Sequence, residues 1–466
     1  RRQRQMCIRD SIYYVAGSNN GVNSDSTVPS GSATSIATDA RFSWSLRGIT
    51  VNAAGTIIYV NDDNQIKKRT KMDLNAGPEY IDFRKNVLSF LEENKHMAGK
   101  ARTPVRPSNE ELKWQKKLID NGYAARTIPK EYGGYGADSD VLKSRIIAEE
   151  FSKANIPMGM ANQGISMLVP TLLELGSDDQ KNDWISKTIS GEVIWCQGYS
   201  EPGSGSDLAS LQTKAIVDGD DFIINGQKIW TSGAQMSDMM FCLVRTEPDA
   251  PKHKGISYVL IDMNSPGIEV RPLMTMTGHA EFNEVFFTDV RVPKNQIVGK
   301  RGEGWYVANA TLTHERGMLG DPNQSATRLN EIIELMQQET INGEKLINNP
   351  VHLDRLMKLQ ARVLSMSFNS LRLLTASHKK LDAKMAKLIV KLNGCQLNHD
   401  LAGFAIDLLG ELGTIYGKSN HDHGSGKWQW KYMFDLGLII GGGTAQIQKN
   451  IISEAGLGMP LSLIHI

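Results

Sequence analysis

The spacing of apolar residues changes twice along the chain, and this restricts the possible folds more than any other feature. Between residues 80 and 189 apolar side chains recur every three or four positions, as in Asp82–Glu92. Between residues 193 and 298 the period falls to two, in short runs such as Ile256–Ile261. From Gly302 to Leu457 the helical spacing returns. We therefore expect a helical region, a small β-region and a second helical region, in that order.

Capping and turn residues predict where several helices begin and end. Gly176 and Ser177 are expected to end one helix, and Asp178 to start the next. A turn at Gly302–Trp305 should open a helix that carries Thr311–Arg316. Further helices are expected at 330–338, 350–374, 383–393 and 401–412.

Composition excludes several classes of protein. A chain of 466 residues is longer than a single hydrophobic core usually accommodates, so two or three domains are expected. A net charge of +1 gives no general attraction to nucleic acid or to an anionic membrane. The four cysteines are scattered without a Cys-x-x-Cys pair, which argues against a disulfide framework or zinc site and fits a reducing compartment. No apolar run approaches the roughly 20 residues of a membrane-spanning helix.

Both ends of the chain differ from the patterned part. Residues 1–71 are rich in Ser, Asn, Gly and Thr with little periodicity, and residues 461–466 also look foreign. We expect both segments to be non-native, with a disordered extension or an organelle-targeting leader as the alternative for 1–71. His421 and His423 lie in a Gly/Ser-rich insertion, where we expect solvated side chains and no metal site.

Two neighbouring stretches in the β-region carry the most distinctive residues. Trp195–Asp207 ends an apolar run and breaks into a turn at Glu201–Gly205. In the second stretch, Asn225-Gly226 predicts a tight hairpin turn between two short strands. The two stretches together place the hydroxyls of Ser200, Ser206 and Ser232 near Trp230, a set that suits a flat aromatic ligand able to form hydrogen bonds. The alternative is an ordinary hairpin followed by a polar turn.

Together these stretches resemble the flavin-binding middle segment of the acyl-CoA dehydrogenase family. The family signature is (Thr/Ser)-Glu-Pro-x-x-Gly-Ser-Asp followed by Asn-Gly-x-Lys-x-Trp, and the resemblance runs from about Met72 to Pro460. It implies an α+β multidomain fold: an N-terminal helical domain, a central small β-barrel or sandwich and a C-terminal four-helix bundle. The domain boundaries expected on this basis are 72–192, 193–300 and 301–460.

The resemblance also implies an FAD cofactor. It assigns contacts with the isoalloxazine edge to Gln197, Ser200 and Ser232, and packing against the ring to Trp230. Thr444 and Gln446, in Gly443–Gln448, would meet the FAD from the last helical region. The alternative for this segment is a plain helix start with Thr444 as N-cap. Asp407 and Glu411 depart from the residues common in the family at the adenine end.

The base departs from the commonest family pattern. Gly442 occupies the position where many members carry a catalytic Glu, so we expect the base to be Glu315, directly before Arg316. The Gly442 backbone N–H would donate to the thioester oxygen. Arg316 and Ser206 are assigned to substrate binding. The alternatives are a surface role for Glu315, a capping role for Ser206, and Glu411 or Asp435 as weaker candidate bases.

The implied reaction is FAD-dependent α,β-dehydrogenation of an acyl-CoA thioester to the trans-2-enoyl-CoA, as in fatty-acid β-oxidation. The implied partners are the acyl-CoA, an electron-transfer flavoprotein, and further copies of the chain in a homodimer or homotetramer. The expected location is the bacterial cytoplasm, or the mitochondrial or peroxisomal matrix of a eukaryote. Two alternatives stay open: an acyl-CoA oxidase, and a non-catalytic flavin-binding subunit of a mixed oligomer.

Overall fold

The computed structural model describes residues 49–51, 58–62, 65–69, 77–99, 106–318, 320–379, 381–417 and 423–460. The side chains of residues 49–69, 315–318 and 423 are outside this description. The expectations for residues 1–48, His421 and 461–466 therefore fall outside it as well. Among the described residues, three short antiparallel strands precede helix α2: β1 (Ile49–Val51), β2 (Ile58–Asp62) and β3 (Gln65–Arg69).

The N-terminal helical region packs around an aromatic core. Its helices are α2 (Pro78–Asn94), α3 (Asn109–Asp120), α4 (Val141–Lys153), α5 (Val169–Leu175) and α6 (Asp178–Ser190). Phe90 of α2 stacks on Trp114 of α3 and on Phe151 of α4. Ser177 caps α6, accepting a hydrogen bond from the Gln180 N–H, so the predicted helix start is confirmed.

The central region is one mixed sheet of eight strands built as two halves. The strands are β4 (Trp195–Gly198), β5 (Lys214–Asp218), β6 (Asp221–Lys228), β7 (Met239–Arg245), β8 (Ile256–Asp262), β9 (Ile268–Leu273), β10 (Phe282–Pro293) and β11 (Ile297–Val298). Their order is β11-β8-β7-β5-β6-β10-β9, with β4 paired to β7. The halves are joined through the single pair Lys214–Arg245. One hydrophobic cluster takes residues from both halves, so they pack face to face as in a sandwich.

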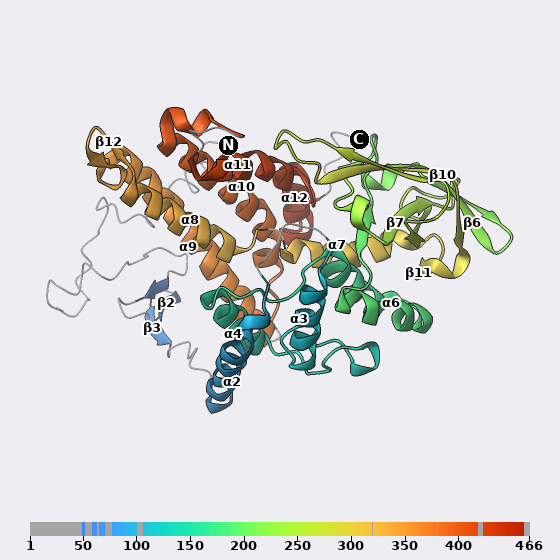
Figure 1. Ribbon diagram of the computed structural model, residues 1–466, viewed down its shortest axis with the longest axis horizontal. Helices are drawn as coiled ribbons and strands as arrows, with labels where there is room; N and C mark the ends of the chain where they lie inside the picture. The colour runs from blue at the N-terminus through green and yellow to red at the C-terminus, as the bar shows by residue number, and fades with distance from the viewer. Residues whose placement is uncertain are drawn as a thin grey trace.

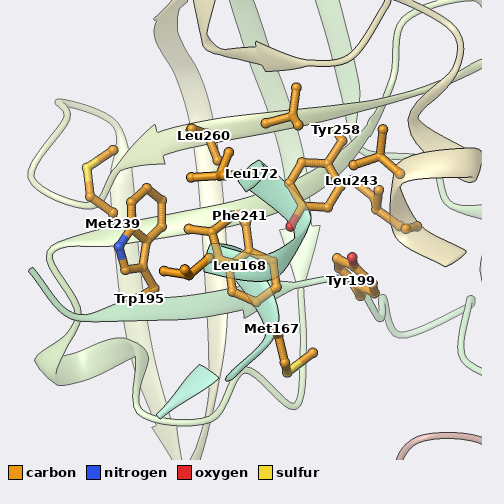
Figure 2. Packing of buried hydrophobic residues seen from close by; sticks show 14 of the residues in the cluster. Met167, Leu168, Leu172, Trp195, Tyr199, Met239, Phe241, Leu243, Tyr258 and Leu260 are labelled. Carbon is orange, nitrogen blue, oxygen red and sulfur yellow. The ribbon is translucent and has the colours of Figure 1, made fainter. Parts of the chain in front are cut away.

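Strand β7 shows why the helices and the sheet form one body. Six consecutive residues of β7 are buried. Met240 and Cys242 face the core between the two sheet halves, whereas Phe241 and Leu243 face a second core shared with helices (Figure 2). Because side chains alternate along a strand, burial on both faces requires a layer on each side. The helical layer on the second face includes Leu168 and Leu172.

The Asn225-Gly226 hairpin prediction was wrong. Strand β6 continues through these residues, and the β5–β6 turn lies at Gly219-Asp220 instead. A Cβ on Gly226 would lie 2.6 Å from Thr213 Oγ1, so the glycine permits a close approach of two chain segments. The Asn225 side chain pairs with Asp289 at an irregularity of β10.

The C-terminal region is helical, and α10 forms its centre. Its elements are α7 (Gly304–Met318), α8 (Pro322–Gln338), β12 (Thr340–Ile341), β13 (Glu344–Lys345), α9 (Pro350–His378), α10 (Lys384–Leu409), α11 (Lys427–Ile440) and α12 (Ala445–Ile451). Helix α10 contacts α8, α9 and α11, and the expected helical bundle is therefore present. Helix α8 begins earlier than predicted, at the N-cap Asp321.

Helix α10 also corrects the expectation of two helices at 383–393 and 401–412, because it is continuous. The polar residue Asn398 between the two expected helices is buried. Its amide pairs with Ser325 and Gln324 of α8, so a neighbouring helix satisfies this polar group and the helix continues through it.

Helix α7 lies in the middle of the molecule, between the N-terminal helices, the sheet and the C-terminal helices (Figure 1). It contacts α5, β8 and α10. Among the described helices, none combines the length and apolar character needed to cross a membrane.

Candidate active site

A buried ion pair shapes the loop that follows β4. Glu201 and Ser204 exchange two backbone hydrogen bonds of 3.0 Å, which close the turn. The Glu201 carboxylate accepts from the N–H groups of Gln212 at 2.6 Å and Thr213 at 2.9 Å. The Lys228 ammonium donates to it at 2.8 Å and is itself fully buried. The loop is thus held against strand β6, which carries Lys228.

The ionisation state of this pair follows from its surroundings. Burial alone would raise the pKa of Glu201, but the Lys228 charge and the hydrogen bonds together lower that pKa below its ordinary value. Lys228 Nζ also donates to the Tyr199 carbonyl oxygen at 3.2 Å. The Glu201 carboxylate therefore stays ionised, and the contacts of the pair fix the backbone on both sides of Ser200.

The structure brings the two predicted flavin stretches together. The Ile229 N–H donates to the Ser200 carbonyl oxygen at 2.9 Å, so Trp230 follows directly beside the Ser200 loop. Gln197, Ser200 and Ser232 are all half-buried, which leaves part of each side chain accessible to a ligand.

Trp230 has an unusual conformation for a bulky residue. Its φ is +61°, and 58% of its surface is exposed. The indole meets Phe282 edge-on at 6.0 Å, and the next residue, Thr231, exchanges two 3.0 Å backbone hydrogen bonds with Asn283. Positive φ in a non-glycine residue costs energy and clusters at functional sites. An exposed aromatic face held in this way is a suitable surface for a planar ligand.

Ser206 lies in the exposed outer part of the same loop. The neighbouring Asp207 pairs with Lys252 at 2.7 Å, and both of these side chains are at least half exposed. Ser206 is therefore not part of the buried contacts of this loop, and its exposed side chain is accessible to a long ligand.

Helix α7 begins in close contact with the sheet. A Cβ on Gly304 would lie 2.4 Å from the Ser257 carbonyl carbon, so only glycine allows this approach. Further along α7, Thr311 Oγ1 lies 3.0 Å from Thr171 Oγ1 and 3.5 Å from Tyr258 Oη. All three groups are completely buried, and burial raises the pKa of Tyr258, which stays neutral.

Glu315 and Arg316 lie on α7 as predicted, and only their backbone is described. Position 315 is one helical turn after Thr311 and therefore lies on the same face of the helix. The hydroxyl contacts of Thr311 fix that face relative to α5 and β8.

The glycine loop 441–443 connects α11 to α12. Gly442 has a φ of +66° and Gly443 a φ of +103°. The buried Gln448 side chain donates to the Gly442 carbonyl oxygen at 2.9 Å. Within the described residues, the N–H groups of Gly442 and Gly443 donate no hydrogen bond. This loop contains no carboxylate, but it has backbone donors available to a ligand.

Thr444 is the N-cap of α12, and its hydroxyl accepts from the Ile447 N–H at 3.3 Å. Gln446 is exposed on α12. No hydrogen bond among the described residues joins Thr444 or Gln446 to the Ser200–Trp230 region. Their assignment to FAD therefore stays a prediction.

The two weaker candidate bases differ in environment. Asp435 is buried and holds Arg328 through both carboxylate oxygens, so it is committed to an ion pair inside the bundle. Glu411 is exposed.

The main contacts that sequence reasoning missed are the Glu201–Lys228 pair and the Thr311–Tyr258 contact. A signal for the first was present, because Phe222, Ile224 and Lys228 share the inward parity of one strand. No local pattern marks the second, because α7 and β8 meet only in the folded chain.

Comparison with known proteins agrees with this architecture. Three family models match: "Acyl-CoA dehydrogenase, N-terminal domain" at residues 77–192, the middle domain at 196–290 and the C-terminal domain at 302–457. Acyl-CoA dehydrogenase IpdE1 of Mycobacterium tuberculosis is 36% identical over 353 residues, covering 75% of this chain and 88% of that protein. The human mitochondrial short-chain specific acyl-CoA dehydrogenase is 30% identical over 322 residues, covering 64% and 73%.

Solved structures show the same fold. The Tcur3481-Tcur3483 steroid ACAD has a TM-score of 0.70 at 27% identity, covering 84% of this chain and 100% of that one. The ChsE4-ChsE5 complex from Mycobacterium tuberculosis has a TM-score of 0.69 at 29% identity, with the same coverage. The order of helical, β and helical regions, the loop after β4 and these matches lead to one conclusion: the chain belongs to the acyl-CoA dehydrogenase family of oxidoreductases.

Proposed function

We propose that this chain converts an acyl-CoA thioester to the trans-2-enoyl-CoA, with Glu315 as the base. The proposal rests on one observation: the backbone donors and the candidate carboxylate lie on two different segments. The glycine loop 441–443 offers backbone donors without a carboxylate, whereas α7 presents Glu315 one turn after the anchored Thr311. In this arrangement Glu315 accepts the proton from the α-carbon, and the Gly442 N–H polarises the thioester oxygen.

The residues around Ser200 fit a flavin. The strained, exposed indole of Trp230 provides an aromatic surface, and the half-buried Gln197, Ser200 and Ser232 provide polar groups at its edge. FAD, when bound, supplies the hydride acceptor, which no amino-acid side chain can provide. Thr444 and Gln446 would hold it from the C-terminal region, and Ser206 and Arg316 would contact the substrate.

The organisation implied by the proposal has domains at 72–192, 193–300 and 301–460, and the chain assembles as a homodimer or homotetramer. An electron-transfer flavoprotein accepts the electrons. An acyl-CoA oxidase is the alternative, in which O2 takes that role. Anaerobic reduction by substrate followed by exposure to air separates them, because an oxidase reoxidises rapidly and releases peroxide.

The base is tested by replacing Glu315 with Gln and following anaerobic bleaching of the flavin. The panel comprises straight-chain, branched and steroid side-chain acyl-CoA thioesters, since one similar structure is described as a steroid ACAD. Loss of a general base lowers the reduction rate by about 10²–10⁴-fold. The matched control is Glu303→Gln, an exposed glutamate just before α7. Equal bleaching rates in wild type and Glu315→Gln would rule out Glu315 as the base.

A second candidate function is a flavin-binding subunit that works with a different partner chain. Asp407 is engaged by Arg355 through a 2.5 Å ion pair, and Glu411 lies nearby at the end of α10. These residues replace the uncharged ones that the family commonly has at the adenine end. One similar structure is a complex of two different chains, ChsE4 and ChsE5.

The two candidates differ in FAD content. A self-sufficient enzyme binds one FAD per chain when purified alone, whereas a mixed-oligomer subunit binds markedly less. If Asp407 and Glu411 are the cause, the double variant Asp407→Gln, Glu411→Gly raises the FAD content. Full occupancy in the unmodified chain excludes the second candidate.

A further inference from the structure

Lys391 is a buried charged residue of α10 to which the mechanism above gives no role. Only 3% of it is exposed. Its ammonium donates to the Ile439 carbonyl oxygen at 2.7 Å and to the Gly443 carbonyl oxygen at 2.5 Å. Ile439 is in the last turn of α11, and Gly443 is the last residue of the glycine loop. One side chain therefore joins the two ends of the Gly441-Gly442 segment.

The glycine loop needs such an anchor. Glycine loses more conformational freedom on ordering than any other residue, so a run of three glycines is entropically costly to hold in one conformation. The Gln448 side chain donates to the Gly442 carbonyl oxygen, and Lys391 donates to the carbonyl oxygens of Ile439 and Gly443 on either side of it. With these carbonyls fixed, the intervening N–H groups have a defined direction.

The same turn of α10 also contacts the chain that leaves α7. A Cβ on Gly320 would lie 2.7 Å from the Val390 carbonyl oxygen, and a Cβ on Gly394 would lie 2.5 Å from Gly320 Cα. The turn Val390–Gly394 thus touches the segment after Glu315 on one side. Through Lys391 it touches the glycine loop on the other.

We propose that Lys391 is a positioning residue, which holds the Gly442 N–H at a fixed place relative to α7 so that it can donate to the thioester oxygen. The inference rests on the proposed function. A backbone donor stabilises developing negative charge only when it is held within about 0.5 Å of the productive position. An unanchored triple-glycine loop does not meet that requirement.

The competing role for Lys391 is purely structural. An ammonium at the C-terminus of α11 also stabilises that helix through its dipole and its last carbonyls. Such a role predicts lower stability with unchanged chemistry in the molecules that remain folded. The positioning role predicts a specific loss in the chemical step.

The test uses the full-length, FAD-loaded protein with Lys391→Ala and the control Lys387→Ala, an exposed lysine one turn earlier on α10. With the acyl-CoA that bleaches the flavin fastest, we expect Lys391→Ala to lower kcat by about 10²-fold, as for loss of an oxyanion donor. KM should change by less than about threefold. Propylammonium, which replaces the missing side chain, should restore part of kcat, whereas NaCl at equal ionic strength should not. Lys387→Ala should match the wild type.

A second readout does not depend on the reaction. Amide hydrogen exchange across 437–448, measured without thioester, should be faster in Lys391→Ala than in the control. If Lys391→Ala does not fold, Lys391→Met keeps most of the side-chain volume and is measured in the same way. An unchanged kcat, or recovery by NaCl alone, overturns the proposal. Faster loop exchange together with full activity of Glu315→Gln would instead indicate that the loop is anchored as described and that the proposed base is wrong.

Discussion

Two loops near the candidate site are each fixed by a buried lysine, but in different ways. In the β-region, Lys228 pairs with the carboxylate of Glu201, so a charge meets an opposite charge. In the helical region, Lys391 donates to the backbone carbonyls of Ile439 and Gly443. The first lysine secures a turn of mixed sequence, and the second secures a run of glycines.

The two loops present different chemical groups to a ligand. The Ser200 loop presents side chains, and its backbone is already restrained by the Glu201–Ser204 bonds. The glycine loop presents only backbone N–H groups, so its conformation is itself the functional feature. We therefore expect loss of Lys228 to affect mainly stability, and loss of Lys391 to affect stability less and chemistry more.

The largest expected effect is that of Lys228→Met. Removing one partner of a buried ion pair leaves Glu201 uncompensated and costs about 3–5 kcal/mol. The measurement is the free energy of unfolding in urea. The double variant Glu201→Gln, Lys228→Met should recover part of the loss, and Lys252→Met, at the exposed pair with Asp207, should cost under about 1 kcal/mol. Equal costs for Lys228→Met and Lys252→Met would contradict this account.

A smaller loss of stability is expected for Lys391→Met. This change leaves carbonyl oxygens in the loop without their donor, which costs about 1–3 kcal/mol. Urea unfolding of Lys391→Met and Lys228→Met under the same conditions compares the two anchors directly. If Lys391→Met costs more than Lys228→Met, the proposed division between a structural and a positioning lysine is wrong.

The contribution of the Glu201–Lys228 pair should also depend on pH. The pKa of Glu201 is lower in the folded protein than its ordinary value of about 4.5. The ionised carboxylate therefore contributes its full stability above that ordinary value, and the contribution disappears as the pH falls through the lowered folded pKa. Unfolding curves from neutral pH to acid should converge between wild type and the Glu201→Gln, Lys228→Met variant. A constant difference across this range would show that Glu201 does not titrate as described.

The smallest effect is expected at Trp230. Gly tolerates a φ of +61° at no steric cost, so Trp230→Gly should relieve about 1 kcal/mol of strain while it removes the aromatic surface. We expect weaker FAD binding, with little loss or a slight gain in the Tm of the FAD-free protein. Trp230→Ala lacks the ring but keeps the strain, so it should bind FAD equally weakly and melt at a lower temperature. Unchanged FAD affinity in both variants would remove Trp230 from the flavin site.

Much of the fold was predictable because its signals are local. The change of apolar period located the β-region, and the break at Gly176-Ser177 before Asp178 located the start of α6, where Ser177 caps the helix through a contact between residues three apart. The errors at β6 and α10 have a common cause. Gly226 suggested a turn and Asn398 lies where a helix break was expected, but contacts with Thr213 and Ser325 keep β6 and α10 continuous.

By itself, the sequence determined the order of helical and β-regions, the loop after β4 and the absence of a carboxylate between residues 441 and 443. It also placed Glu315 on a helix. Only the tertiary structure decided that Lys228 faces Glu201, and that α10 supports both α7 and the glycine loop. The physical reason is range: periodicity and capping depend on neighbours a few residues apart. Burial of a lysine against a distant carbonyl depends on how whole helices pack.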